Sequence, residues 1–449
     1  MSDDASKDIK TGNTLNIGTS DKPAIGLSAK NIRNFETINF YLPSNVANNA
    51  VALNLTGANN TDLSKTSVYA YLSNASNLTK DSVIHLISTQ GTLVDFDEAN
   101  GKANLTNVNI AGLINVTGKI ALDSTSKNLD LTFNDDEDTG GSGTGGGSSI
   151  TANENSKQLL ETNLAGVASI NNAGNLLSEN LDKITPKDSN ANIFAFGFIG
   201  GSDKRYKTGS HIDLKGFSAN VGIATKDESG RLTAGIFAEY GKADFETYLD
   251  NGLEGKGDTK FMGGGLFAKF VAQSNFYGEG SIRLGKIKTN SDKGMYNEYE
   301  LSSSYYGAHV GLGKIFELNN TNNLDIYTKY FYSHTDSANT TISGVDVNFA
   351  GIASSRVQVG VKDTIKFSET SSLYAGLAYQ YEAKGKAEGS VSVLNQSAGI
   401  ASPSLKGSTG IAELGYAYET NSIKFDIGAK GYTGKEKGYS GNVGVTVKF

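Results

Sequence analysis

The chain ends in Tyr439-Ser-Gly-Asn-Val-Gly-Val-Thr-Val-Lys-Phe449, an extended segment whose side chains separate into two sets. Because the side chains of a β-strand alternate between two faces, one face carries Tyr439, Val443, Val445, Val447 and the terminal Phe449. The positions between them are small or polar. A strand with one face toward lipid and one toward water requires this alternation, although a soluble sheet can also show it. The residues that precede this segment decide between a membrane strand and a strand of a soluble sheet.

The same alternation recurs from about residue 190 to the end of the chain. Phe194, Phe196 and Phe198 alternate with Ala195 and Gly197, and similar segments follow. Short connections lie near 226–230, 273–275, 319–323, 369–372 and 420–422, and longer ones near 202–209, 250–259, 289–301, 337–353 and 389–408. Alternating short and long connections are typical of outer-membrane barrels, with tight periplasmic turns and long surface loops. We therefore predict an all-β membrane protein with a twelve-stranded antiparallel transmembrane barrel.

Composition narrows the function classes. Charged residues make up 19% of the chain and the net charge is −7, so no basic surface for nucleic acid is expected. The absence of Cys excludes disulfides and thiolate metal sites, and it suits passage through an oxidising periplasm. No apolar run is long enough for a transmembrane helix, and residues 1–30 lack the apolar core of a signal peptide.

Residues 1–138 contain short β-like runs separated by Asn, Gly and Asp. Stacked rungs of a β-solenoid fit this pattern, and a small sandwich is the alternative. A Gly/Ser-rich linker follows at 139–150. The barrel domain is assigned to 189–449.

A helix is predicted within 151–188, where apolar residues recur at spacings of three and four. Its apolar face includes Leu160, Leu164, Val167, Leu177 and Leu181, and Pro186 ends it. Asn171 and Gly174 interrupt this face, so the helix is suited to lining a polar cavity or capping a core.

The alternation also predicts which charges point into the barrel. A charge on the lipid face costs about 2–4 kcal/mol at mid-membrane, so charges are expected in the lumen. The predicted lumen-facing set is Glu239, Glu279, Arg283, Lys329, Arg356, Lys362, Glu382, Glu413, Lys424, Asp426 and Lys430. A hydrophilic lumen of this size has space for about one helix.

These features together resemble the monomeric (type V) autotransporters of Gram-negative outer membranes. The final strand resembles the signal read by the barrel assembly machinery, the helix resembles the pore-spanning helix, and residues 31–133 resemble the β-helical, autochaperone-like end of a passenger. The resemblance implies outer-membrane localisation, with the passenger exported to the cell surface. It also implies periplasmic chaperones as partners and a passenger that is an adhesin or other virulence factor with a host or bacterial ligand.

Catalytic chemistry is sparse. His85, His211, His309 and His334 are far apart in the sequence, so we expect no enzyme, no metal site and no cofactor. Some autotransporters cut their helix at an Asn-Asn bond, and this chain has Asn171-Asn172 at mid-helix, although the flanking residues differ from the longer motif. Self-cleavage there is one hypothesis. A polar helix face against a wet lumen is the other.

Two alternatives to an autotransporter remain. An outer-membrane barrel enzyme, such as a lipase or protease, would bring a His–Ser or His–Asp cluster together. A passive porin or adhesin barrel would not need the helix.

Overall fold

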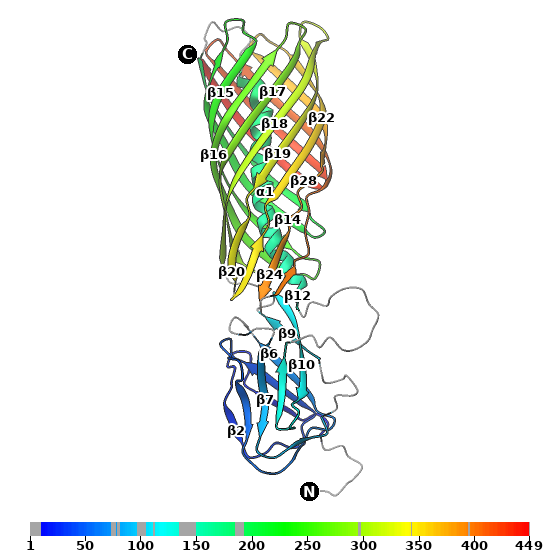
Figure 1. Cartoon of the computed structure of the whole chain (residues 1–449). Coiled ribbons are helices and arrows are strands. Elements are labelled where there is room, and N and C mark those ends of the chain that lie inside the picture. Colours follow the sequence, from blue (N-terminus) through cyan, green and yellow to red (C-terminus); the bar gives the residue numbers. More distant parts are fainter. Residues whose placement is uncertain are drawn as a thin grey trace, which may run out of the picture. The chain divides into compact units, whose positions relative to one another are not determined.

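Residues 193–448 form a closed antiparallel barrel, shown in Figure 1. This computed structural model describes residues 10–72, 78, 81–96, 105–110, 113–133, 150–184, 193–294, 298–342, 344–393 and 396–448. In order around the barrel, the strands are β13 (Ile193–Lys207), β14 (His211–Lys226), β15 (Leu232–Tyr248), β16 (Glu254–Val271), β17 (Phe276–Lys293), β18 (Tyr299–Glu317), β19 (Asn322–Thr335), β22 (Ile352–Lys366), β23 (Ser371–Glu382), β26 (Gly407–Glu419), β27 (Ile423–Gly434) and β28 (Glu436–Lys448). The predicted twelve-stranded barrel is confirmed.

The barrel closes where its last strand pairs with its first. Phe194 lies opposite Lys448, and Tyr206 lies opposite Glu436. On β28 the predicted outward residues Tyr439, Val443, Val445 and Val447 are exposed or half-buried, and Phe449 lies outside the described residues. In the part of the chain that the structure describes, no helix is both long and apolar enough to cross a membrane.

The outer wall carries an apolar band, defined as the outward-facing hydrophobic positions of the barrel strands. Val221, Leu284 and Leu377 expose 63%, 70% and 66% of their surfaces. The band runs over about nine residues of each strand, the length of a transmembrane strand. Lipid is the solvent that accepts so much exposed apolar surface.

The two ends of the barrel differ in their connections. At one end, here called the turn end, the links 227–231, 272–275, 318–321, 367–370 and 420–422 are short, as predicted. At the opposite, hairpin end the predicted long loop at 202–209 is wrong, because β13 continues to Lys207 and turns within 208–210. Strands also continue through most of 250–259 and 289–301. Among the barrel connections that the structure describes, only the links 336–351 and 383–406 are long.

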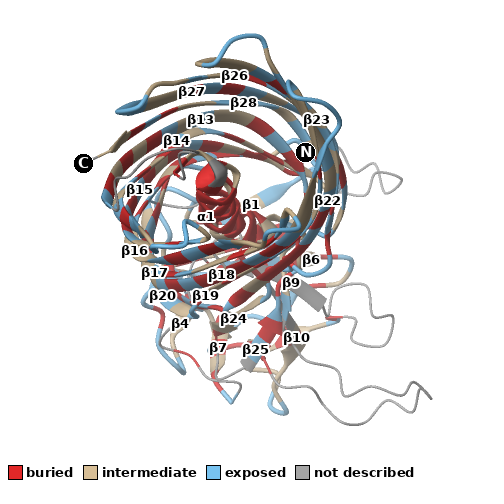
Figure 2. Cartoon of the chain, turned by 90° about the horizontal axis from the view of Figure 1, so that it is seen from above, coloured by how far each residue is buried: buried red, intermediate tan, exposed pale blue. Residues whose placement is uncertain are grey.

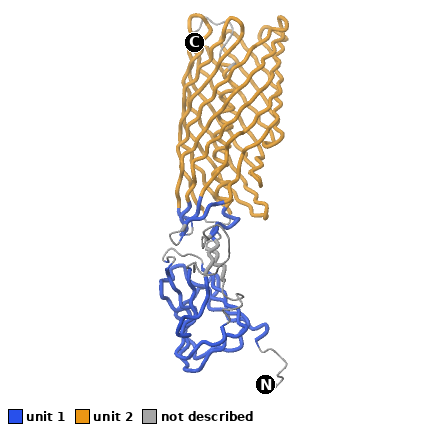
Figure 3. The backbone as a smooth tube through the Cα atoms, turned by 45° about the vertical axis from the view of Figure 1, so that its right-hand side comes forward, with its two compact units in different colours: residues 1–156, 341–347, 390–400 blue, residues 157–340, 348–389, 401–449 orange. Residues whose placement is uncertain are grey.

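These two long links carry strands of their own. β20 (Ala338–Ile342), β21 (Val345–Phe349), β24 (Gly389–Val393) and β25 (Gln396–Gly399) form a four-stranded sheet. The chain divides into two compact units, coloured in Figure 3: residues 1–156 with 341–347 and 390–400, and residues 157–340 with 348–389 and 401–449. The tips of both links therefore group with the N-terminal residues.

Parallel pairing dominates the N-terminal part of the first unit. Its strands are β1 (Thr14–Ile17), β2 (Leu27–Ala29), β3 (Thr37–Leu42), β4 (Val51–Leu55), β5 (Thr61–Asp62), β6 (Ser67–Leu72), β7 (Val83–Thr89) and β8 (Leu93–Val94). The parallel pairs are β1 with β3, β3 with β6, β2 with β4, β4 with β7, and β5 with β8. Strands that pair with their counterparts one turn earlier and later are the arrangement of a β-solenoid.

The pairing becomes antiparallel toward the end of this unit. β10 (Ile114–Leu122) pairs with β9 (Leu105–Ile110), β11 (Asn128–Thr132) and β12 (Ile150–Ala152), and β11 pairs with β7. The solenoid expected over residues 1–138 therefore ends in an antiparallel meander. The predicted Gly/Ser-rich linker lies almost wholly outside the described residues.

Asp123 fixes the turn between β10 and β11. Its carboxylate accepts hydrogen bonds from the Thr125 hydroxyl at 2.8 Å, the Lys127 amide at 2.9 Å and the Asn128 side chain at 3.0 Å. Partial burial opposes ionisation, but these hydrogen bonds outweigh it, and the pKa of Asp123 lies below its ordinary value.

Candidate functional site

The long helix α1 (Lys157–Ile184) lies inside the barrel, as the view from above in Figure 2 shows. A short 3-10 turn at Glu154–Ser156 leads into it, and the Asn153 side chain accepts a hydrogen bond from the Asn155 amide, as a helix cap does. At 28 residues the helix is about 42 Å long, more than the thickness of the hydrocarbon core. The helix predicted ahead of the barrel is confirmed.

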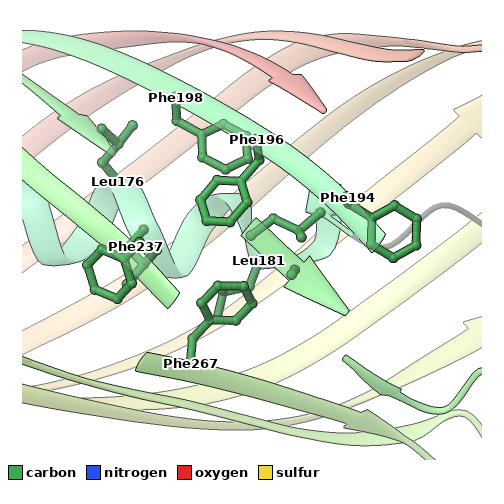
Figure 4. Close-up of a cluster of buried hydrophobic side chains, with 10 residues drawn as sticks. Leu176, Leu181, Phe194, Phe196, Phe198, Phe237 and Phe267 are labelled. Atoms are coloured by element: carbon green, nitrogen blue, oxygen red, sulfur yellow. The ribbon is translucent and has the colours of Figure 1, made fainter. Parts of the chain in front are cut away.

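One side of the helix packs against an apolar part of the wall. Figure 4 shows Leu176 and Leu181 of α1 among five phenylalanines from β13, β15 and β16: Phe194, Phe196, Phe198, Phe237 and Phe267. A second cluster joins Ile170 and Ala173 to Phe261, Ile287 and Tyr305. The predicted helix residues Leu160, Leu164, Val167, Leu177 and Leu181 are all buried. The lumen, which we expected to be hydrophilic, is therefore apolar on this side.

The other side of the helix pairs with charged and polar groups of the wall. Lys430 contacts Glu179 of the helix at 2.9 Å and Glu413 of β26 at 3.0 Å. Lys183 pairs with Asp426 on β27 at 2.5 Å. On β19, Lys329 donates to the Ser178 hydroxyl at 2.9 Å. Apolar packing on one side and ion pairs on the other fix the rotation of the helix about its axis.

Gly174 and Asn171, which interrupt the apolar face, occupy the places where the wall reaches the helix. A Cβ atom at Gly174 would lie 2.9 Å from Arg283 Nη2. That guanidinium donates to the Ile170 carbonyl at 2.7 Å and to Glu239 at 3.1 Å. Asn171 donates to Ser354 at 2.9 Å and accepts from Ser333 at 2.8 Å. Glycine thus makes room for an arginine from the wall.

Asn172 faces the seam between the first and last strands. Its side-chain oxygen accepts from Lys204 at 2.9 Å and from Tyr206 at 3.1 Å, both on β13. Lys204 also pairs with Glu436 of β28 at 3.2 Å. Sequence reasoning missed Lys204 and Tyr206 because it placed 202–209 in a loop, where strand parity has no meaning.

The predicted lumen charges all lie on the strand faces opposite the apolar band. Those that are buried are Glu239, Glu279, Arg283, Lys329, Arg356, Glu382 and Asp426, and those that are half-buried are Lys362, Glu413, Lys424 and Lys430. Five of them line a cavity of about 1220 Å³ beside the C-terminal part of α1, at the turn end: Lys362, Glu413, Lys424, Asp426 and Lys430. The helix therefore fills only part of the cross-section there.

A serine, a histidine and a glutamate meet on the inner wall. Ser281 Oγ lies 2.9 Å from His309 Nδ1, and His309 Nε2 lies 3.3 Å from Glu279 Oε1. Lys329 and Lys269 contact the same carboxylate at 2.8 and 3.5 Å. A hydrolase needs its carboxylate to stabilise the histidine cation. Because two lysines already neutralise Glu279, the cluster serves as part of the lumen's ion-pair network.

The other histidines are not brought together. His85 pairs with Asp130 at 2.6 Å, His211 stacks on Tyr248, and His334 lies near Tyr306. They do not join the cluster around His309.

A closed barrel with an apolar outer band and a helix in its lumen defines an outer-membrane barrel that carries an internal plug. The family model described as the autotransporter beta-domain matches residues 193–444. The chain belongs to the autotransporter family, and its barrel is an outer-membrane translocator.

Solved structures of translocators are similar to this chain. The translocator domain of NalP from Neisseria meningitidis matches with a TM-score of 0.50 and 15% identity, over 64% of this chain and 98% of that one. The transport unit of AIDA-I from Escherichia coli gives 0.48 and 14%, over 66% and 99%. The beta domain of the Bordetella autotransporter BrkA gives 0.45 and 12%, over 57% and 100%. A comparison with curated protein sequences finds no match.

Proposed function

We propose that this translocator exports residues 1–133 of its own chain and that α1 stays in the lumen afterwards as the plug. The observation that carries the proposal is the two-sided anchoring of α1, by apolar packing on β13–β16 and by two ion pairs to β27. The chain segment that would leave the barrel last is thus the one that fits it best.

In this proposal, folding of the exported segment gives export its direction, since no nucleotide is present outside the cell. Within the first unit, β12 pairs with β10 and contacts β25 of the four-stranded sheet. The meander of β10–β12 would form first on this sheet, and solenoid rungs would then add one at a time. Each rung that folds withdraws unfolded chain from the equilibrium and favours further export.

Cysteine labelling in intact cells tests export, because the native chain contains no Cys. Lys22→Cys places a thiol on an exposed passenger position, and Ser229→Cys places one in an exposed link at the turn end. With the chain expressed behind a cleavable export signal, a membrane-impermeant maleimide should label Lys22→Cys and not Ser229→Cys. Equal protection of both thiols would contradict export.

Deleting residues 157–184 separates a translocator from a passive barrel. If α1 belongs to the export route, the deletion variant inserts but leaves Lys22→Cys unlabelled. Unchanged labelling would favour the porin or adhesin barrel, which has no use for the helix.

For assembly we propose that the barrel machinery reads the outward face of β28, formed by Tyr439, Val443, Val445 and Val447. Val445 exposes 38% of its surface and contributes little to the packing of the barrel interior. Val445→Ser should lower the amount of folded barrel in cells several-fold while leaving refolding of the purified chain in detergent unchanged. An equal loss in both settings would show a stability effect and not a signal.

For the passenger we propose a binding role, as an adhesin. The outer face of β3 and β6 exposes Tyr69 and Tyr71, and Tyr71 stacks on Tyr41 with ring centres 4.7 Å apart. Exposed aromatic residues are enriched where proteins bind partners. Adherence of cells that display the wild-type chain or the triple variant Tyr41→Ser, Tyr69→Ser, Tyr71→Ser measures the role, and equal adherence would contradict it.

A further inference from the structure

Four neighbouring strands each present an outward-facing lysine at the same level of the outer wall, just beyond the apolar band. On each of these strands the apolar band ends, toward the hairpin end, with one hydrophobic residue. These residues are Phe217 of β14, Tyr240 of β15, Met262 of β16 and Leu284 of β17. The next outward-facing residue on each strand is a lysine. These are Lys215, Lys242, Lys260 and Lys286, here called the lysine belt. β15–β17 lie side by side in Figure 1.

The belt is exposed, and two of its lysines, Lys242 and Lys260, face each other. The side chains of Lys215, Lys242 and Lys260 expose 79%, 42% and 45% of their surfaces, and Lys286 is also exposed. Lys242 lies directly opposite Lys260, and Lys260 lies directly opposite Lys288. Like charges directly opposite one another on neighbouring strands are destabilising. An anion at this level would remove the repulsion.

Acidic residues form the next outward row on three of these strands, at Asp213, Asp244 and Asp258. Lys242 lies 4.0 Å from Asp244, and Lys260 lies 3.2 Å from Asp258. Exposed ion pairs of this kind stabilise little, so the lysines stay available to another anion. Because the acidic row repels anions, an anionic ligand is restricted to the level of the belt, at the membrane boundary.

We infer that the lysine belt binds the phosphate groups of an outer-leaflet lipid whose acyl chains lie against the apolar band below. In outer-membrane barrels the short turns face the periplasm, so the hairpin end of this barrel faces the outer leaflet. Positive side chains at the belt and hydrocarbon contacts at Met262 and Leu284 are continuous, which matches a lipid with a phosphorylated headgroup. The other side of the barrel has no such belt among the described residues: β26 and β27 continue past the band with Ser408 and Thr433.

The test uses the full-length chain, refolded in detergent and titrated with fluorescent bisphosphorylated lipid A. The test variant is Lys215→Gln, Lys242→Gln, Lys260→Gln, Lys286→Gln. The matched control removes four exposed lysines of the hairpin end that lie outside the belt, three of them in the link between β23 and β26 on the opposite side and one on β28: Lys384→Gln, Lys386→Gln, Lys406→Gln, Lys437→Gln. Both variants change the net charge equally, and a shift in gel mobility on heating reports that each barrel is folded.

A lysine near a membrane surface contributes about a fivefold change in affinity for anionic lipid. We expect the test variant to bind the lipid more than about tenfold more weakly than wild type, and the control variant to bind within about twofold. Lipid A without phosphates should bind weakly, and with equal affinity to the wild type and to both variants. Affinity for the phosphorylated lipid should also fall as salt rises.

Three results would overturn the inference: unchanged binding by the test variant, equal weakening of test and control variants, or equal binding of phosphorylated and dephosphorylated lipid. Inorganic phosphate provides a further arm, because a free anion that binds as tightly as the lipid would show a phosphate site without lipid recognition. If the fourfold variant does not fold, the pair Lys242→Gln, Lys260→Gln is judged by the same criteria, with Lys384→Gln, Lys386→Gln as its control.

Discussion

The guanidinium of Arg283, on the barrel wall, donates a 2.7 Å hydrogen bond to the backbone carbonyl of Ile170 in the lumenal helix. The contact exists because Gly174, one turn further along the helix, has no side chain to exclude the arginine. Wall and helix are thus fitted to each other at the level of single atoms.

Gly174→Leu should therefore loosen the plug. The new side chain displaces Arg283 and leaves Glu239 buried without its cation, a loss of about 3 kcal/mol or more. The heating temperature at which the folded barrel loses its compact gel mobility should fall. Gly197→Ala, where an added Cβ meets nothing within 4 Å, is the control and should leave that temperature unchanged. Equal temperatures for wild type and Gly174→Leu would contradict the fitted contact.

Lys430→Met should open a path for ions. Its removal leaves Glu179 and Glu413 facing each other. Because these groups are half-buried, the loss is smaller than the ~3–5 kcal/mol of a fully buried pair. The helix should leave its place more often, so the conductance of single barrels in planar bilayers should rise. Lys406→Met, in an exposed link, should behave as wild type. Conductance that does not differ between the two variants would show that Lys430 does not hold the helix.

The self-cleavage hypothesis predicts a fragment that begins at Asn172. Ser354 Oγ accepts from the Asn171 amide and donates to Glu382 at 2.7 Å, which gives a proton path from the attacking nitrogen to a carboxylate. Ser354→Ala should then slow formation of the fragment, whereas Ser355→Ala should not. Gel analysis of the surface-expressed protein measures this, and a wild-type chain that stays at full length would reject the hypothesis in favour of the polar helix face.

Acid should weaken the first unit through Asp123. Its folded-state pKa is depressed, so its contribution is present above the unfolded value near 3.8 and is lost as pH falls through the folded pKa. Asp123→Asn should reduce the free energy of unfolding at pH 7 by about 0.5–1 kcal/mol. It should also reduce the pH dependence below pH 4.

Limited proteolysis of residues 10–133 in the refolded chain, followed at increasing urea concentration, measures both effects. Asp21→Asn, at an exposed position, is the control. An unchanged urea midpoint for Asp123→Asn at pH 7 would contradict the role of this carboxylate in the turn.

Most of the fold could be predicted from the alternation of apolar and polar residues along the strands. Residues such as Val357, Val359 and Val361 alternate with Arg356, Gln358 and Lys362, and only a wall between lipid and water sorts side chains so consistently. Strand parity does not tell whether an apolar face of a strand points to the lipid or to the barrel interior. Phe194, Phe196 and Phe198 point inward, because α1 covers that part of the wall, and no local pattern on β13 reveals the covering helix.

The site was predictable in its charges and not in its contacts. Glu239 and Arg283 were identified by parity, but their approach to the helix depends on register between residues more than a hundred positions apart. Lys204 and Tyr206 were missed for a simpler reason. Polar residues at the end of a strand look like a loop, and β13 continues through them because β14 and β28 both pair with it.

The helix and the barrel belong to one polypeptide, and this has a kinetic consequence. A separate plug would have to find its pore by diffusion, and some pores would always stand open. Here every barrel is synthesised together with its own plug helix, so the ratio of plug to barrel is one to one at any expression level. Closure is then an intramolecular event whose rate does not depend on protein concentration, and the integrity of the cell envelope does not depend on a second gene product.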